Sequence, residues 1–83
     1  MSEPMIEHPV HAPDMLGPLL AAARKQSGMT QEQIGKQLGI TQGRVSQIER
    51  RASKVTMAMV LHYANLVGFE LIMRRRQRPE SSW

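Results

Sequence analysis

The 83-residue sequence contains no cysteine and only one phenylalanine, one tyrosine and one tryptophan. The absence of cysteine excludes disulfides, thiol catalysis and zinc fingers, and it favours a reducing, cytoplasmic location. With so few aromatic residues, the core must be aliphatic and filled out with methionine. The longest uncharged run, residues 55–69, is too short to span a bilayer. Glu3 and Glu7 lie where a secretory signal would be positively charged, so no signal peptide is expected.

Acidic residues are in the minority, with seven Asp and Glu against eleven Lys and Arg and a net charge of +4. Three of the acidic residues lie in residues 1–15, which contain no Lys or Arg, so the rest of the chain is strongly basic. This imbalance favours an anionic partner. No nucleophile, general base and oxyanion donor converge, and His8 and His11 lack a third metal ligand. The sequence therefore predicts no enzyme, no cofactor and no metal site.

The spacing of apolar residues divides the chain into four parts. Residues 1–14 contain three of the five prolines and are expected to form an extended N-terminal arm. From residue 15 to residue 68 the apolar residues recur with a helical period, which predicts one domain of four to five helices. Residues 69–75 alternate with the period of a strand. The remaining residues, 76–83, are expected to form a flexible basic tail.

Hydroxyl residues mark the starts of the predicted helices, and glycines mark their ends. The first helix is expected to start between residues 15 and 17 and to stop at Ser27. Thr30 and Gln33 have the spacing of a capping box, in which each side chain bonds to the other residue's backbone N–H. The predicted N-caps of the second, third and fourth helices are Thr30, Thr41 and Thr56. Gly28, Gly39 and Gly68 are expected to end the first, second and fourth helices, and no glycine follows the third.

The third and fourth predicted helices differ in their faces. In the third, Val45 and Ile48 point inward and leave a polar outer face, which contains Gln42, Gly43, Arg44, Gln47 and Arg51. The fourth has an apolar stripe that is expected to be buried, made of Met57, Val60, Leu61, Ala64 and Val67. It also has a second apolar side, made of Met59, Tyr63 and Leu66. Two apolar sides on a short helix indicate a second surface to be covered by chain ends or another subunit.

The predicted strand has no partner strand within the chain. Phe69, Leu71 and Met73 alternate with residues 70, 72 and 74, as in a strand. Because an isolated strand leaves its backbone groups unpaired, we expect it to pair with the same strand of a second copy in a symmetric homodimer. The predicted dimer interface contains Phe69, Leu71, Ile72, Met73, Tyr63 and Leu66.

A helix, a tight turn at Gly39 and a second helix in a basic chain form the layout of a helix-turn-helix motif. In this motif the first helix crosses the sugar-phosphate backbone of DNA, and the second enters the major groove. Gly35 permits close packing of the two helices. Gly43 costs about 1 kcal/mol relative to alanine inside a helix. Its presence indicates that a side chain at this position would obstruct the groove.

Two stretches resemble a known family. Residues 28–51 read GMTQEQIGKQLGITQGRVSQIERR and resemble the helix-turn-helix of the lambda-repressor and Cro class, with a likeness that extends over residues 15–69. Residues 66–76 read LVGFELIMRRR and are similar to HipB-type antitoxins, as are residues 13–17 and the terminal Trp83. The sequence departs from the class at Gly35, where alanine is usual, and at Arg51, where glycine is usual.

The resemblance implies an all-α, lambda-repressor-like domain with a C-terminal strand that pairs in a homodimer. It also implies roles for individual residues, because glutamine pairs with adenine and arginine with guanine in the major groove. The implied base contacts are Gln42, Gly43, Arg44 and Gln47, and the implied phosphate contacts are Gln31, Thr41, Ser46, Arg50, Arg51 and Lys54. Arg24 and Glu49 are expected to form a structural salt bridge. Trp83 is a candidate contact for a toxin.

The leading hypothesis is a dimeric repressor that reads an inverted repeat in double-stranded operator DNA and autoregulates its operon. In this hypothesis it is also the antitoxin of a HipA-like serine/threonine kinase. The alternative is a stand-alone phage-type or metabolic repressor with no toxin partner. A third possibility, a protein-interaction module that has lost DNA binding, is disfavoured by the basic outer face.

Overall fold

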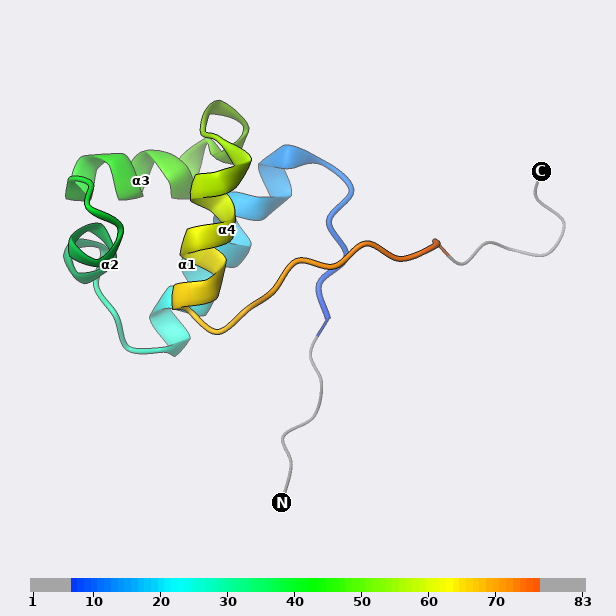
Figure 1. Cartoon of the computed structure of the whole chain (residues 1–83), viewed down its shortest axis with the longest axis horizontal. Helices are drawn as coiled ribbons and strands as arrows, with labels where there is room; N and C mark the ends of the chain where they lie inside the picture. Colours follow the sequence, from blue (N-terminus) through cyan, green and yellow to red (C-terminus); the bar gives the residue numbers. More distant parts are fainter. Residues whose placement is uncertain (1–6, 77–83) are drawn as a thin grey trace, which may run out of the picture.

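The computed structural model describes residues 7–76, and these residues form an all-helical domain (Figure 1). In chain order the elements are the 3-10 turn η1 (Pro13–Met15), α1 (Leu16–Gln26), α2 (Gln31–Leu38), α3 (Gln42–Arg50), the 3-10 turn η2 (Ala52–Lys54) and α4 (Met57–Leu66). The all-helical class predicted from the sequence is confirmed for this part of the chain. None of its helices combines the length and the apolar content that a membrane span requires.

Side-chain caps start three of the four α-helices where the sequence predicts them. The hydroxyl of Thr30 accepts from the Gln33 backbone N–H at 3.1 Å, and the Gln33 side chain accepts from the Thr30 N–H at 2.8 Å. At the starts of α3 and α4 the hydroxyls of Thr41 and Thr56 accept from the backbone N–H three residues later, at 3.1 and 3.2 Å, without the reciprocal bond. Gly39 ends α2 with φ +74°, a left-handed conformation that favours glycine. The predicted capping box and the turn between α2 and α3 are therefore confirmed.

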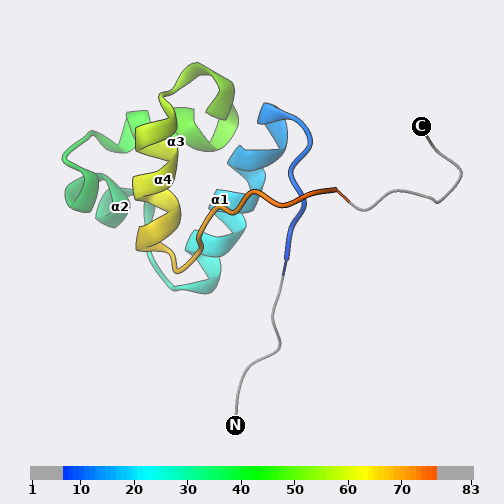
Figure 2. The same ribbon diagram turned by 45° about the vertical axis from the view of Figure 1, so that its right-hand side comes forward.

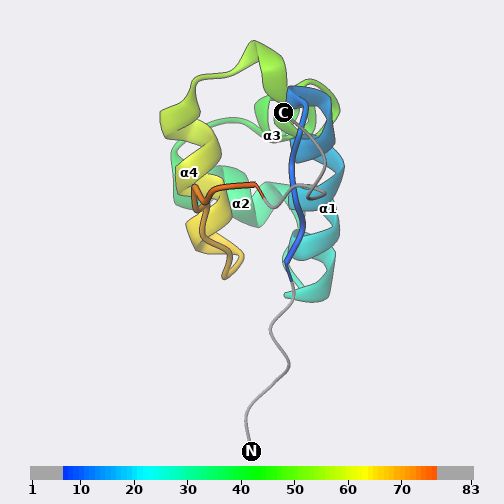
Figure 3. The same cartoon turned by 90° about the vertical axis from the view of Figure 1, so that its right-hand side faces the viewer.

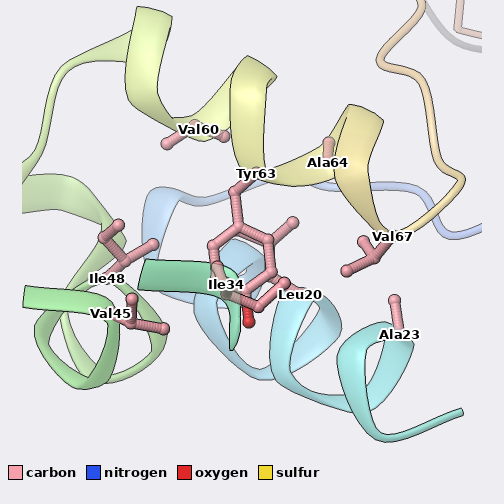
Figure 4. Packing of buried hydrophobic residues seen from close by; sticks show 9 residues of the cluster. All are labelled: Leu20, Ala23, Ile34, Val45, Ile48, Val60, Tyr63, Ala64 and Val67. Atoms are coloured by element: carbon pink, nitrogen blue, oxygen red, sulfur yellow. The ribbon is translucent and has the colours of Figure 1, made fainter. Parts of the chain in front are cut away.

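Nine buried side chains fill the space that separates α1 from α4 (Figures 3 and 4). Figure 4 shows the Tyr63 ring extending from α4 to the centre of this core, between Ile34 of α2 and Leu20 of α1. Val45 and Ile48 close the core from α3 and are 0% and 1% exposed, which confirms that they point inward. The core residues are Leu20, Ala23, Ile34, Val45, Ile48, Val60, Tyr63, Ala64 and Val67.

The predicted buried face of α4 is confirmed for Val60, Ala64 and Val67 and wrong for its other two residues. Met57 and Leu61, which were expected to be buried, are 60% and 40% exposed. Tyr63, which was expected at the dimer interface, is 0% exposed and belongs to the core of its own chain. The reason is that apolar residues lie on two sides of α4, so the helical period alone cannot choose between two overlapping stripes. The stripe that is buried contains Val60, Tyr63, Ala64 and Val67.

Two glycines allow α3 and the turn before it to pack closely on the other helices. A Cβ atom on Gly17 of α1 would overlap the backbone oxygen of Glu49, near the end of α3. A Cβ atom on Gly35 of α2 would lie 2.7 Å from the backbone oxygen of Ile40. The close approach predicted at Gly35 is confirmed, and the one at Gly17 was not predicted. Together these contacts fix α3 against α1 and α2.

Residues 69–76 form no strand within this chain and run away from the helices past the N-terminal arm (Figure 2). A strand exists only when its backbone groups pair with a second strand, and the described residues of one chain provide none. The arm and this segment meet through the Phe69 and His8 rings, whose centroids are 6.0 Å apart, and through an exposed Glu7–Arg74 ion pair at 3.0 Å. Pairing of residues 69–75 across a homodimer stays a prediction.

Gly17→Ala is expected to lower the free energy of unfolding by about 1–3 kcal/mol, because the added methyl group forces α1 away from α3. The matched control is Gly43→Ala in α3, where an added Cβ meets no atom closer than the Thr41 hydroxyl at 3.8 Å. The free energy of unfolding of Gly43→Ala is expected to be higher than that of the wild type by about 0.5–1 kcal/mol, since alanine is the better helix former. Urea unfolding of the two variants measures both changes. Equal stability of Gly17→Ala and the wild type would contradict the close approach.

Candidate nucleic-acid interface

The N-terminal half of α3 carries the side chains that are predicted to contact DNA. Figure 1 shows α3 along one edge of the domain, with the turn that contains η2 rising beyond its C-terminal end. Gln42, Gly43 and Arg44 are exposed and Gln47 is half-buried, whereas Val45 and Ile48 of the same helix are buried. The structure therefore brings the four predicted base-contacting residues onto one open helical face. Their contacts with bases stay a prediction.

Positive charge lies along the same helix and in the turn that follows it. Arg44, Arg50 and Arg51 are exposed, and Lys54 is exposed on η2 directly after them. Among residues 7–76 these four side chains form no ion pair, and the carboxylate of Glu49, which directly precedes Arg50, is bound to Arg24. A hollow of about 350 Å³ is lined by Gly43, Gln47, Arg50 and Arg51. This surface can accept an anion such as a phosphate group.

The remaining predicted phosphate contacts border this surface. Thr41 is exposed, and its hydroxyl oxygen accepts the backbone N–H of Arg44, which leaves the hydroxyl proton available to an acceptor outside the protein. Ser46 is half-buried, and its backbone oxygen accepts from Arg50 Nε at 3.4 Å. Gln31, the first residue of α2, lies beside α3, and its Oε1 accepts from Gln42 Nε2 at 3.4 Å. The two helices thus meet through a pair of glutamines at the open face.

Glu49 is the centre of a cluster of hydrogen bonds behind this face. Its Oε2 accepts from Arg24 Nε at 2.7 Å and from the Tyr63 hydroxyl, and its Oε1 accepts from Arg24 Nη2 at 3.2 Å and from Gln31 Nε2 at 3.0 Å. Arg24 also donates from Nη1 to the Met29 backbone oxygen at 3.0 Å. The Arg24 and Glu49 side chains are 11% and 8% exposed. This is the ion pair that the resemblance implies, and it joins all four α-helices.

Sequence reasoning missed two members of this cluster. Tyr63 was grouped with apolar residues, although a buried tyrosine needs a partner for its hydroxyl, and that need is a signal that could have identified it. Gln31 was assigned to phosphate contact alone, although its amide has both donors and acceptors to satisfy. Trp83, the candidate toxin contact, lies outside the described residues.

The electrostatics of the cluster follow from these contacts. Burial by itself raises the pKa of the Glu49 carboxyl, but the hydrogen bonds from Arg24, Tyr63 and Gln31 outweigh burial and hold that pKa below its usual value. The hydrogen bond with Glu49 raises the pKa of Arg24. Burial, followed by the hydrogen bond to Glu49, raises the pKa of Tyr63. At neutral pH the cluster therefore consists of the Arg24 cation, the Glu49 carboxylate and the neutral Tyr63 phenol, whose hydroxyl donates a hydrogen bond to Glu49.

The fold and this face together define a helix-turn-helix domain. A family model for sigma-70 region 4 matches residues 22–55, which run from the middle of α1 to just after η2. No curated protein matches the sequence.

Solved structures with a similar fold contain HipB chains. A chain of a HipB–O1–O2 complex is 20% identical with a TM-score of 0.75, and the match covers 83% of this chain and 100% of that one. A chain of a HipA–HipB–O2–O3 complex is 20% identical with a TM-score of 0.77, covering 86% and 100%. A HipB variant in complex with an O2 20mer is 19% identical with a TM-score of 0.78, covering 87% and 100%. The chain therefore has the fold of HipB.

Glu49→Gln is expected to lower the free energy of unfolding by about 3 kcal/mol at neutral pH, because Arg24 then lacks its counter-ion. This difference in the free energy of unfolding between the wild type and Glu49→Gln should narrow as the pH falls below 4.5 and through the lowered folded-state pKa of Glu49. The folded-state pKa of Glu49 lies below its ordinary value of 4.5, so its stabilising effect is complete above that value and is lost as the pH falls through the folded-state pKa. Urea unfolding of both proteins at several pH values measures the gap, and a gap independent of pH would argue against an ionised Glu49.

Proposed function

We propose that this chain is a dimeric, sequence-specific DNA-binding repressor that regulates its own operon through inverted-repeat operators. We further propose that it is the antitoxin of a HipA-like serine/threonine kinase. The observation that carries DNA binding is the open face of α3, where Gln42, Gly43, Arg44 and Gln47 lie together beside exposed cations. The surface has the residue types that read base edges in the major groove.

Each side chain of the interface has a role that its chemistry supports. Gln42 and Gln47 carry amides that can pair with adenine, and Arg44 carries a guanidinium group that can pair with guanine. The cations Arg50, Arg51 and Lys54 suit phosphate oxygens, which fix the register of a protein on the duplex. The polar groups of Gln31, Thr41 and Ser46 border the same surface and are assigned to phosphate as well.

The C-terminal segment supports the dimer. Leu71 and Ile72 are 40% and 63% exposed, and Met73 is fully exposed, an unusual set of large apolar side chains for one short segment to leave uncovered. Pairing of residues 69–75 with the same segment of a second copy would cover them and satisfy the backbone. A twofold dimer presents two α3 helices, which is the arrangement that reads an inverted repeat.

The antitoxin role rests on similarity of fold. The HipB chain of the HipA–HipB–O2–O3 complex shares the fold of this chain over its whole length, which supports a HipA-like partner here. The alternative is a stand-alone repressor that shares the DNA chemistry and lacks a toxin. Purification of the chain with its native operon products separates the two: a co-purifying kinase of much larger mass supports the antitoxin, and a chain that purifies alone supports the stand-alone repressor.

Arg44→Ala is expected to weaken operator binding by about 1–3 kcal/mol and to relax the preference at one base pair, because a base contact is lost. The matched control is Arg50→Ala, which should weaken binding to all sequences alike and reduce the slope of log affinity against log salt by about one. Titrations of footprinted upstream DNA and of its single-base variants measure both effects. An equal loss from Arg44→Ala on every sequence would reassign that residue to phosphate.

Ile72→Asp and Leu71→Asp are each expected to dissociate the dimer, because a buried carboxylate in a paired strand is costly. The core is built without these residues, so the helical content of the monomer should be retained. Glu70→Gln, in the same segment, is the matched control and should leave the dimer intact. Sedimentation measures the mass of each variant. A dimer that persists in both aspartate variants would contradict strand pairing.

A further inference from the structure

Two serines of the described chain follow a pair of basic residues at the same spacing. Residues 24–27 read RKQS and residues 50–53 read RRAS, so each serine has basic residues three and two positions before it. Serine/threonine kinases select substrates partly by such charge patterns, and carboxylates in the peptide groove of a kinase bind arginine strongly. The pattern occurs at both Ser27 and Ser53, and the fold decides which of them a kinase can reach.

Ser27 is held by the cluster around Glu49. Arg24, three residues before this serine, binds both carboxylate oxygens of Glu49, and its side chain is only 11% exposed. The Ser27 hydroxyl donates to the Arg24 backbone oxygen at 2.8 Å. A kinase could engage this segment only after the ion pair had come apart, and the loss of one partner from such a pair is costly.

Ser53, by contrast, is accessible. It is the middle residue of η2 and is exposed, as are Arg50 and Arg51 before it and Lys54 after it. Within residues 7–76 none of these three cations is in an ion pair, so their charge is available to a partner. Figure 1 shows the turn that contains η2 at the opposite end of α4 from residues 69–76. The site is therefore clear of the segment that is assigned to subunit pairing.

The η2 turn is held by two backbone hydrogen bonds and one buried methyl group. The Lys54 N–H donates to the Arg51 oxygen at 2.9 Å, and the Val55 N–H donates to the Ala52 oxygen at 3.2 Å. Ala52 is its buried residue, and an alanine loses little when it is exposed. Because segments with little buried apolar surface open locally at a lower cost than the whole domain, this turn can extend into the groove of a kinase.

We propose that Ser53 is a phosphorylation site for a serine/threonine kinase that selects arginine at the two positions before it, and that phosphate there releases the protein from DNA. In the transfer, Ser53 Oγ attacks the γ-phosphorus of ATP, and the bond from that phosphorus to the β,γ-bridging oxygen breaks. ADP leaves with the electron pair of that bond, and the hydroxyl proton passes to the catalytic base of the kinase. Because DNA and the kinase use the same arginines, the modification acts on the free protein.

The added phosphate acts on the cations that are assigned to DNA phosphate. A phosphoserine carries a charge of about −1.5 to −2 at neutral pH and three acceptor oxygens. At position 53 it lies between Arg51 and Lys54 in the sequence, so it competes with the DNA backbone for them and also repels the duplex. This release rests on the proposed DNA binding, whereas the modification of Ser53 does not.

The first experiment determines which serine accepts phosphate. The full chain is incubated with MgATP and cyclic-AMP-dependent protein kinase, as a probe that selects arginine at these two positions, and mass spectrometry locates the modified residue. Phosphate is expected on Ser53 and not on Ser27, and Ser53→Ala should lose most of the incorporation. The chain isolated from its own cells should carry phosphate on the same residue. Modification of Ser27 in place of Ser53, or no phosphate on Ser53 in both growing and starved cells, overturns the site.

The second experiment measures DNA affinity with the phosphorylated protein. Phosphate on Ser53 is expected to weaken binding to the footprinted upstream duplex by about tenfold or more, and to reduce the slope of log affinity against log salt by about two. The matched control is kinase-treated Ser53→Ala, which should bind as the unmodified wild type does. Urea unfolding checks that the phosphorylated protein keeps its fold.

The outcomes separate the site from its effect on DNA. Undiminished binding by the folded protein with phosphate on Ser53 overturns the release from DNA. An unmodified protein that binds no duplex overturns the proposed DNA binding, and the location of the phosphate then decides the modification site by itself.

Discussion

The rest of the structure depends on the hydrogen bonds that converge on the buried Glu49 carboxylate. It lies near the end of α3 and is reached by side chains from α1, α2 and α4, so it sets the relative positions of all four helices. A domain of this size has a small core, and only a few side chains other than aliphatic ones help to fill it. A shared polar contact therefore provides much of the geometric definition that a larger core would provide through packing.

The local features of the fold could be predicted because they depend on neighbouring residues. Thr30, Thr41 and Thr56 start helices by bonding to backbone groups three residues later, and Gly39 ends one by its own conformation, so a short stretch of sequence contains the whole cause. The inward direction of Val45 and Ile48 follows from a single apolar stripe in a polar helix. The open face of α3 was predictable for the same reason.

The features that could not be predicted depend on contacts between residues that lie far apart in the sequence. In α4 two apolar stripes compete, and only packing against α1 and α2 turns Tyr63 inward and Leu61 outward. The approach of Gly17 to Glu49 joins residues far apart in the sequence. The partnership of Gln31 with Glu49 likewise needs the final arrangement of α2 and α3. For residues 69–75 the missing information lies in a second chain, since pairing is a property of two strands.

The N-terminal arm and the C-terminal segment of the described chain lie against each other. Glu7 is paired with Arg74, and the His8 ring lies near Phe69, so the N-terminal arm lies against the segment that is assigned to subunit pairing. In a twofold assembly both arms and both C-terminal segments would gather around the symmetry axis. A reporter group attached at residues 7–8 or within residues 69–76 would thus lie beside the contact between subunits in such an assembly, and it would disturb assembly before it disturbed α3.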